Sequence, residues 1–269
     1  MSRKNSFDEG KYLYCIVNRG EEKQFGLIGI EDSSVYMVAF NNIAVVVHSC
    51  KAKPYSTTVK EKAGEWIFAH QYVIDLATEE FGTVIPLTCD TIFRGNNKEL
   101  KNWLSKEYSQ LETLLKKLDG QAEYAVQIFL APEFLDKLAS ENDEVRSIEK
   151  NLKNMSNGVA YLLKKKSEQR KELEKQLIVE RRAKELLSQI KPLVNDAILG
   201  SISREVPEKW RDKRMILNAA CLVPKDKIEA LGSKLGQLKK EGYAVRFTGP
   251  WPPYNFVGQI NETKLVRGE

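Results

Sequence analysis

The sequence predicts an α+β protein with two domains, and three observations support that class. The chain has 269 residues, which is enough for about two domains of ordinary size. Short runs with strand-like alternation and longer runs with helical spacing occur in both halves. The order of these runs in the second half matches a ferredoxin-like βαββαβ unit. We therefore expect an N-terminal mixed α/β domain at residues 1–120 and a modified ferredoxin-like domain at 121–269, with a long helical insertion at about 132–199.

The first domain opens with strand-like runs. They are Lys11–Arg19, Phe25–Ile30, Val35–Phe40 and Ile43–Ser49. The first and last of these contain stretches that are apolar at successive positions, which is typical of central strands buried on both faces. A later short run, Thr83–Leu87, contains Pro86, which cannot donate to a strand ladder, so we expect a short strand or an edge segment there.

Two helices are predicted in the first domain. The first spans about Lys60–Phe81, and Gly82 is a plausible stop. Its apolar stripe consists of Ala63, Trp66, Ile67, His70, Ile74, Ala77 and Phe81. His70 lies on that stripe, so we interpret it as a hydrogen-bonded core histidine rather than a catalytic base. The second helix spans about Lys98–Leu118, and Asp119-Gly120 marks the expected domain boundary.

The second domain is expected to contain strands at Ala122–Leu130, Ser201–Val206, Met215–Val223 and Tyr243–Phe247. A helix with an inward row of leucines and isoleucine lies between the last two and ends near Gly242. In the βαββαβ arrangement, the first and third strands should be central and the second and fourth should lie at the edges. The second predicted strand is charged, which suits an edge.

The long helical region between the first two strands is the unusual part of this domain. We expect a break near Ser156-Asn157-Gly158 and an exposed helix beyond it. Residues 164–185 are rich in both basic and acidic side chains, and a thin apolar row accompanies them. The proposed partner-docking residues of this helix are Leu162, Leu163, Leu173 and Leu177. A simple solvated face and a nucleic-acid site formed by the basic clusters are the alternatives, and the interleaved glutamates weaken the latter.

The end of the chain carries its most distinctive motif. Its members are Gly249, Pro250, Trp251, Pro252, Pro253, Tyr254 and Phe256. The prolines fix the backbone and remove donors, so the aromatic rings can pack on a rigid extended segment. This segment is expected either to close a core and brace the domains or to form an exposed aromatic docking surface.

Composition and motif content argue against several function classes. The net charge of +5 is mild and permits an acidic partner without requiring nucleic acid. No secretory signal or membrane-spanning run is apparent, so we expect a cytosolic protein. The four cysteines are scattered, and we expect no metal site, no cofactor and no small-molecule substrate. Phosphate loops and hydrolase motifs are absent from the sequence, which predicts that the chain is not an enzyme.

Several motifs resemble one known family over nearly the whole chain. They are Tyr12–Val17 (family Y-L-Y-G-I, with Cys15 replacing glycine), His70–Ile74 (H-x-x-V-L), Val84–Leu87 (V-L-P-L), Gly120–Tyr124 (G-x-x-E), Gly158–Leu163 (G-x-x-Y-L-L) and Gly249–Phe256 (G-P-W-P-P-Y-x-F). The last is highly specific and the others are individually weak. Thr88–Thr91 departs from the R-F-G-T that often follows V-L-P-L, so no role tied to that arginine and phenylalanine carries over. On these motifs the chain is identified as a member of the gas vesicle accessory family GvpL/GvpF.

The resemblance implies a non-enzymatic role in forming gas vesicles, the hollow protein shells that give microbes buoyancy. It implies binding of the small hydrophobic shell protein, contacts with other accessory proteins, support of nucleation and a location that includes the gas-facing side of the shell. It also implies two α+β domains, the second a modified ferredoxin-like fold. The alternative is a general cytosolic interaction module whose basic helix binds an acidic protein or RNA.

Overall fold

The computed structural model describes residues 9–152, 157–202, 208–258 and 265–266, which form two compact units. The first unit contains the described residues of Met1–Glu123 and Pro250–Glu269, and the second contains those of Tyr124–Gly249. Both units combine helices and strands, which confirms the predicted α+β class. The C-terminal segment groups with the first unit, whereas it was expected in the second domain.

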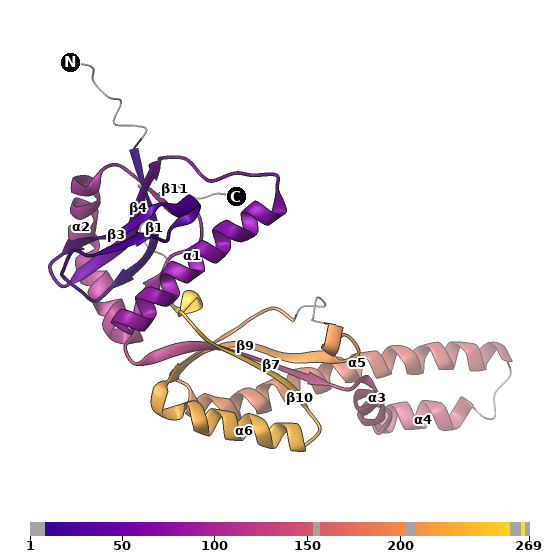
Figure 1. The fold of residues 1–269 in the computed structure, drawn as a ribbon. Coiled ribbons are helices and arrows are strands. Elements are labelled where there is room, and N and C mark those ends of the chain that lie inside the picture. The colour runs from indigo at the N-terminus through magenta and orange to yellow at the C-terminus, as the bar shows by residue number, and fades with distance from the viewer. Residues whose placement is uncertain (1–8, 153–156, 203–207, 259–264, 267–269) are drawn as a thin grey trace, which may run out of the picture. The chain divides into compact units, whose positions relative to one another are not determined.

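The first unit is built on an antiparallel sheet (Figure 1). Its strands are β1 (Glu9–Val17), β2 (Gln24–Leu27), β3 (Ser34–Phe40), β4 (Ile43–Lys51), β5 (Val84–Pro86), β6 (Ile92–Arg94) and β11 (Leu265–Val266). The described strands follow the order β11-β6-β1-β4-β3-β2, and β5 pairs with β1. The apolar strands β1 and β4 are neighbours in the middle, as their composition predicts.

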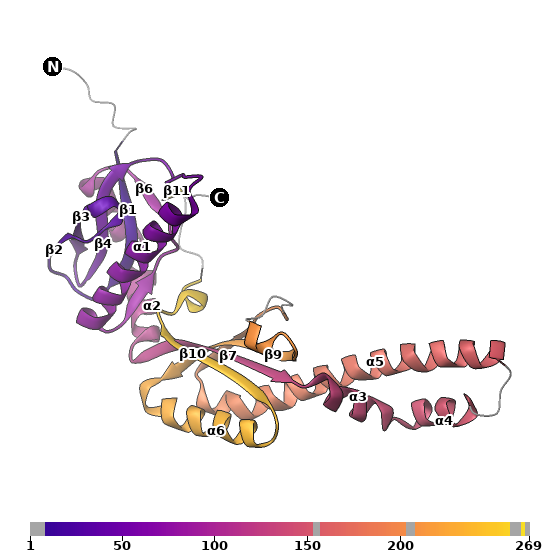
Figure 2. The same ribbon diagram turned by 45° about the vertical axis from the view of Figure 1, so that its right-hand side comes forward.

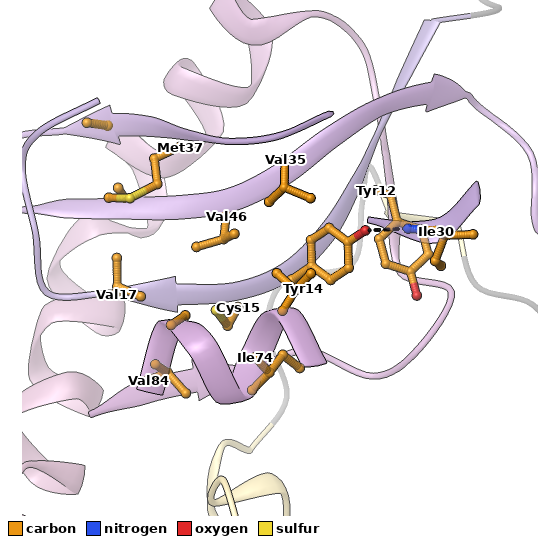
Figure 3. Packing of buried hydrophobic residues seen from close by; sticks show 14 of the residues in the cluster. Tyr12, Tyr14, Cys15, Val17, Ile30, Val35, Met37, Val46, Ile74 and Val84 are labelled. Carbon is orange, nitrogen blue, oxygen red and sulfur yellow. Dashed lines mark hydrogen bonds between the residues drawn. The ribbon is translucent and has the colours of Figure 1, made fainter. Parts of the chain in front are cut away.

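Two helices, α1 (Lys60–Phe81) and α2 (Asn97–Leu118), lie on opposite sides of this sheet (Figures 1 and 2). The core under α1 joins Val73, Ile74 and Ala77 to apolar side chains of β1, β3 and β4 (Figure 3). The start of α2 is fixed by a capping box, in which Asn96 and Glu99 satisfy each other's backbone N–H groups. Both helices match the predicted ranges to within one residue.

Three features of this unit differ from the predictions. Strands β6 and β11 were not predicted, because runs of three and two residues give too little alternation to detect. Ile67 was placed on the buried stripe of α1 but is 58% exposed, because it lies roughly 70° from the middle of that stripe.

The second unit has a four-stranded antiparallel sheet in the described residues, with the order β10-β7-β9-β8. Its strands are β7 (Gln121–Leu130), β8 (Asp196–Leu199), β9 (Arg214–Pro224) and β10 (Ala244–Trp251). The first and third strands of the unit are central and the other two are at the edges, as predicted for a ferredoxin-like sheet. Helix α6 (Ile228–Lys240) buries its leucines against the sheet.

The predicted long insertion consists of three helices. They are α3 (Pro132–Ser140), α4 (Asp143–Leu152) and α5 (Asn157–Ile190), and the first two pack along the third (Figure 2). The predicted break falls at the start of α5, and Ser156 lies outside the described residues. The helical region ends at Ile190 rather than at 199, and the second strand is Asp196–Leu199 rather than Ser201–Val206. Arg204 and Glu205, the charged residues of that predicted strand, lie outside the described part of the chain.

Candidate interaction site

The terminal motif is built into the first unit. Pro252 and Pro253 are buried, and Phe256, in the short helix η5 (Tyr254–Phe256), is also buried. The Tyr254 hydroxyl donates to the Gln71 side chain of α1 at 3.1 Å. These contacts favour the interpretation of the motif as a clamp that closes a core.

A buried carboxylate anchors the same segment. Glu123 is 6% exposed and accepts hydrogen bonds from the backbone N–H of Asn255, at 2.9 Å, and from the Asn255 side-chain amide. Charge-assisted bonds of this kind are stronger than neutral ones. Trp251 is the large exposed ring of the motif, at 47%, while Gly249 and Pro250 are exposed beside it.

The predicted docking leucines of α5 do not share one environment. Leu162, Leu173 and Leu177 are exposed, at 66%, 46% and 44%, whereas Leu163 is half-buried. The inner face of α5 carries Ile178, which is buried, and α3 and α4 pack along the helix. The exposed leucines therefore form a row on the side of α5 away from its buried face.

Many basic residues of α5 form ion pairs within the insertion made of α3, α4 and α5, which we call the arm. Arg170 pairs with Glu144 at 3.0 Å, Lys171 pairs with Glu149 at 2.5 Å, and Lys175 contacts both Asp136 and Glu172. Acidic side chains of α3, α4 and α5 itself thus neutralise much of the basic helix. This arrangement disfavours the nucleic-acid alternative.

Both histidines of the chain lie in a hydrogen-bonded network beneath α1. His70 places Nε2 3.0 Å from the Leu87 carbonyl oxygen and Nδ1 2.9 Å from the Tyr12 hydroxyl. A carbonyl can only accept, so Nε2 carries the proton and Nδ1 accepts from Tyr12. The Tyr12 oxygen in turn accepts the backbone N–H of Asp90 at 2.9 Å.

The second branch of the network ends at Tyr55. The buried Tyr14 hydroxyl accepts the Ile30 N–H at 3.1 Å and lies 2.7 Å from His48 Nδ1 (Figure 3). His48 Nε2 in turn lies 3.0 Å from the Tyr55 hydroxyl oxygen, so His48 bridges the two tyrosines with one ring nitrogen donating and the other accepting.

Burial keeps these groups uncharged. It lowers the pKa of both His48 and His70 to about 4 and raises the pKa of the Tyr12, Tyr14 and Tyr55 hydroxyls. Near neutral pH the network holds neutral imidazoles whose nitrogens are fully used. We interpret it as a structural core, which agrees with the predicted role of His70.

A pocket of about 770 Å³ opens above this network. It is lined by Tyr12, Ile30, Pro54, Tyr55, Ser56, Thr57, Ala63, Trp66, Ile67, Cys89 and Asp90. The Tyr55 and Trp66 rings meet edge to face at 5.2 Å between centroids. At the rim Lys62 lies over the Trp66 ring and pairs with Glu31 at 2.9 Å. The pocket wall thus combines aromatic and aliphatic side chains with polar ones, and an ion pair lies beside it, a mixture that is common in protein-binding sites.

Helix α1 also carries exposed apolar side chains close to the pocket in sequence. Ile67, which lines the pocket, is 58% exposed, and the next residue, Phe68, is 74% exposed. Tyr72 lies one turn further along and is 45% exposed. We call Ile67, Phe68 and Tyr72, together with this pocket, the α1 surface. Sequence reasoning missed it, although two aromatic residues four apart and off the buried stripe are a usable signal.

The described residues offer neither a membrane-spanning helix nor a metal-binding cluster. No helix in the described ranges is long and apolar enough to cross a bilayer. Among the same residues, no group of three or more histidine, cysteine, aspartate or glutamate side chains is placed to hold a metal ion.

Comparison with known proteins gives consistent matches over nearly the whole chain. The family model for gas vesicle synthesis protein GvpL/GvpF matches residues 10–258. Gas vesicle protein L1 of Halobacterium salinarum is 31% identical, over 97% of this chain and 95% of that protein. Gas vesicle protein F1 of the same organism is 25% identical, over 93% of each. The crystal structure of GvpF from Anabaena superposes with a TM-score of 0.71 at 19% identity, over 94% of this chain and 99% of that one.

Proposed function

Because this chain belongs to the GvpL/GvpF family of gas vesicle synthesis proteins and takes part in gas vesicle formation, we propose that it binds the small apolar shell protein and supports nucleation of the shell. The family consists of structural and accessory gas vesicle proteins. A non-enzymatic role agrees with that family and with two histidines whose nitrogens are fully used inside the core.

The observation that carries the proposal is the α1 surface. An apolar subunit that assembles into a wall has to keep its apolar surface covered until it reaches the growing edge. The α1 surface offers three exposed apolar side chains beside a pocket that can accept one further apolar side chain. Large exposed apolar residues around a concavity are typical of docking sites.

The chemistry of the pocket wall refines the binding mode. Tyr55 lines this wall, and its hydroxyl can hydrogen-bond a backbone group of the bound subunit while an apolar side chain enters between Trp66 and Ile67. The ion pair of Lys62 and Glu31 remains at the rim, where it costs little desolvation. We also propose that the chain contacts other gas vesicle accessory proteins and lies at the gas-facing side of the shell.

The test is coexpression of the tagged chain with the shell protein, followed by affinity purification. We expect the shell protein to stay soluble and to co-purify with the wild-type chain. The double variant Ile67→Ser/Phe68→Ser should reduce the co-purified shell protein at least about tenfold, because exposed anchors dominate such interfaces. Both positions are more than half exposed, so the unit should keep its stability.

A matched control is Leu27→Ser, which removes another exposed apolar side chain of the first unit, at the edge strand β2. It should bind the shell protein like the wild type. Precipitation of the shell protein despite the wild-type chain would overturn shell binding. Equal recovery with the double variant and the control would overturn the assignment to the α1 surface.

A further inference from the structure

We infer that the outer face of α5 is a self-association surface, on which α5 of a second copy of this chain packs antiparallel with Leu173 at the two-fold axis. The surface consists of Leu162, Lys166, Leu173, Leu177 and Glu180. These residues recur at helical spacing along one side of α5. The inference concerns the second unit alone and does not depend on shell binding by the α1 surface.

The outer face is not needed for the fold of the arm itself. Leu135 and Ala139 of α3 and Val145 and Ile148 of α4 are buried, and these two helices pack along α5. The charges on the inner side are also paired, as for Arg170 with Glu144. Because α3 and α4 already cover the inner side of α5, the exposed leucines on its outer face indicate a contact with another molecule.

The charges on the outer face of α5 indicate that the partner is a second copy of this chain and that the two helices pack antiparallel. Lys166 lies seven residues before Leu173 and Glu180 lies seven residues after it, so all three share one face. Neither Lys166 nor Glu180 forms an ion pair with any described residue. In an antiparallel pair centred on Leu173, each Lys166 therefore faces the Glu180 of the other copy.

The remaining positions of the row also fit this register. Leu177 meets Gln169 of the second copy, four residues from the axis, and Leu162 meets the aliphatic stem of Lys184, eleven residues from it. A parallel pair would instead place Lys166 on Lys166 and Glu180 on Glu180. Like charges in direct opposition are unfavourable, so the antiparallel arrangement is selected. A contact with so few apolar anchors should be weak and depend on protein concentration.

Charge reversal tests the register. We expect sedimentation equilibrium of the full chain to show a monomer–dimer equilibrium that the single variants Lys166→Glu and Glu180→Lys each weaken several-fold. The double variant Lys166→Glu/Glu180→Lys should restore it, because the pair is re-formed with exchanged signs. A monomer at every concentration, or a double variant no better than the single ones, would overturn the inference.

Cysteine cross-linking tests the axis independently. In a Cys89→Ser background, Leu173→Cys should form a disulfide-linked dimer on mild oxidation, since a two-fold axis brings identical side chains together. The matched control is Glu168→Cys, an exposed position of the same helix that lies off this face. Equal cross-linking at the two positions, or none at 173, would contradict the antiparallel pair.

Discussion

At the residue scale, the least expected feature is a core that is polar at its centre. The chain has two histidines, and both are buried with tyrosine hydroxyls as partners. The sequence predicted the position of His70, because it falls on the helical stripe of α1. The partnership with Tyr12 was not predictable, since 58 residues separate the two and no local pattern joins them.

Removing one hydroxyl should show how much this network contributes. Tyr14→Phe leaves the Ile30 N–H and His48 Nδ1 without their partner inside the core. We expect the free energy of unfolding to fall by about 1–3 kcal/mol, the usual cost of unsatisfied buried groups. Urea denaturation measures this, with Tyr36→Phe as the control, because the Tyr36 hydroxyl bonds are exposed. An equal loss of unfolding free energy in both variants would show that the buried network stabilises the protein no more than the exposed bonds do.

Acid should weaken the first unit through the same histidines. In the unfolded chain an imidazole has a pKa of 6.5, whereas burial lowers the pKa of His48 and His70 to about 4. Between these values the unfolded state binds more protons, so the free energy of unfolding falls as pH is lowered from about 6.5 towards 4. Each histidine contributes at most about 1.4 kcal/mol per pH unit.

Urea titrations between pH 7 and 5 test this, above the range where most carboxylates titrate. His70→Gln should have a shallower pH dependence than the wild type, because one of the two buried imidazoles is gone. A slope unchanged by this substitution would assign the acid sensitivity to other groups.

At the element scale, prediction succeeded where a segment contained both a clear apolar pattern and a residue that marks its end. Helix α1 was placed at its observed bounds because the apolar spacing and Gly82 agree. Strand β8 was misplaced because its four residues follow a long helix closely and were included in the helical region predicted to 199, so the strand was sought beyond it, at 201–206. Strand β11 has two residues and is held by β6, so its existence depends on a distant pairing. The α1 surface was missed for a related reason, since its pocket joins residues from five separate segments.

The cap of α2 gives a prediction at this scale. Asn96 accepts from the backbone N–H groups of Lys98 and Glu99, at 2.9 and 3.1 Å. Asn96→Ala should cost about 1 kcal/mol of stability, measured by urea denaturation, because these donors lose their partner. Asn96→Asp keeps an acceptor next to the helix N-terminus and should retain wild-type stability. A loss of similar size in both variants would mean that the cap bonds do not stabilise the unit.

At the scale of the whole molecule, the chain leaves its first unit, forms the second and returns to complete the first. The clamp of Pro252, Pro253 and Phe256 and the strand β11 all come from the returning segment. The ferredoxin-like second unit was predictable from its order of elements. The return was not, because a motif that follows a strand in sequence gives no sign of which sheet it will pack against.

Truncation after Gly249 tests the importance of that return. The shortened chain loses a buried ring and two buried prolines from the first unit, and it leaves the Glu123 carboxylate without the Asn255 bonds. We expect hydrogen exchange to rise across β1, β4 and α1, while β7 and β9 of the second unit keep their protection. Asn255→Ala, which removes only the side-chain bond to Glu123, should produce a smaller change in the same direction, because the buried ring and prolines remain. A truncated chain with native exchange in the first unit that no longer binds the shell protein would instead assign the terminal aromatic segment to docking.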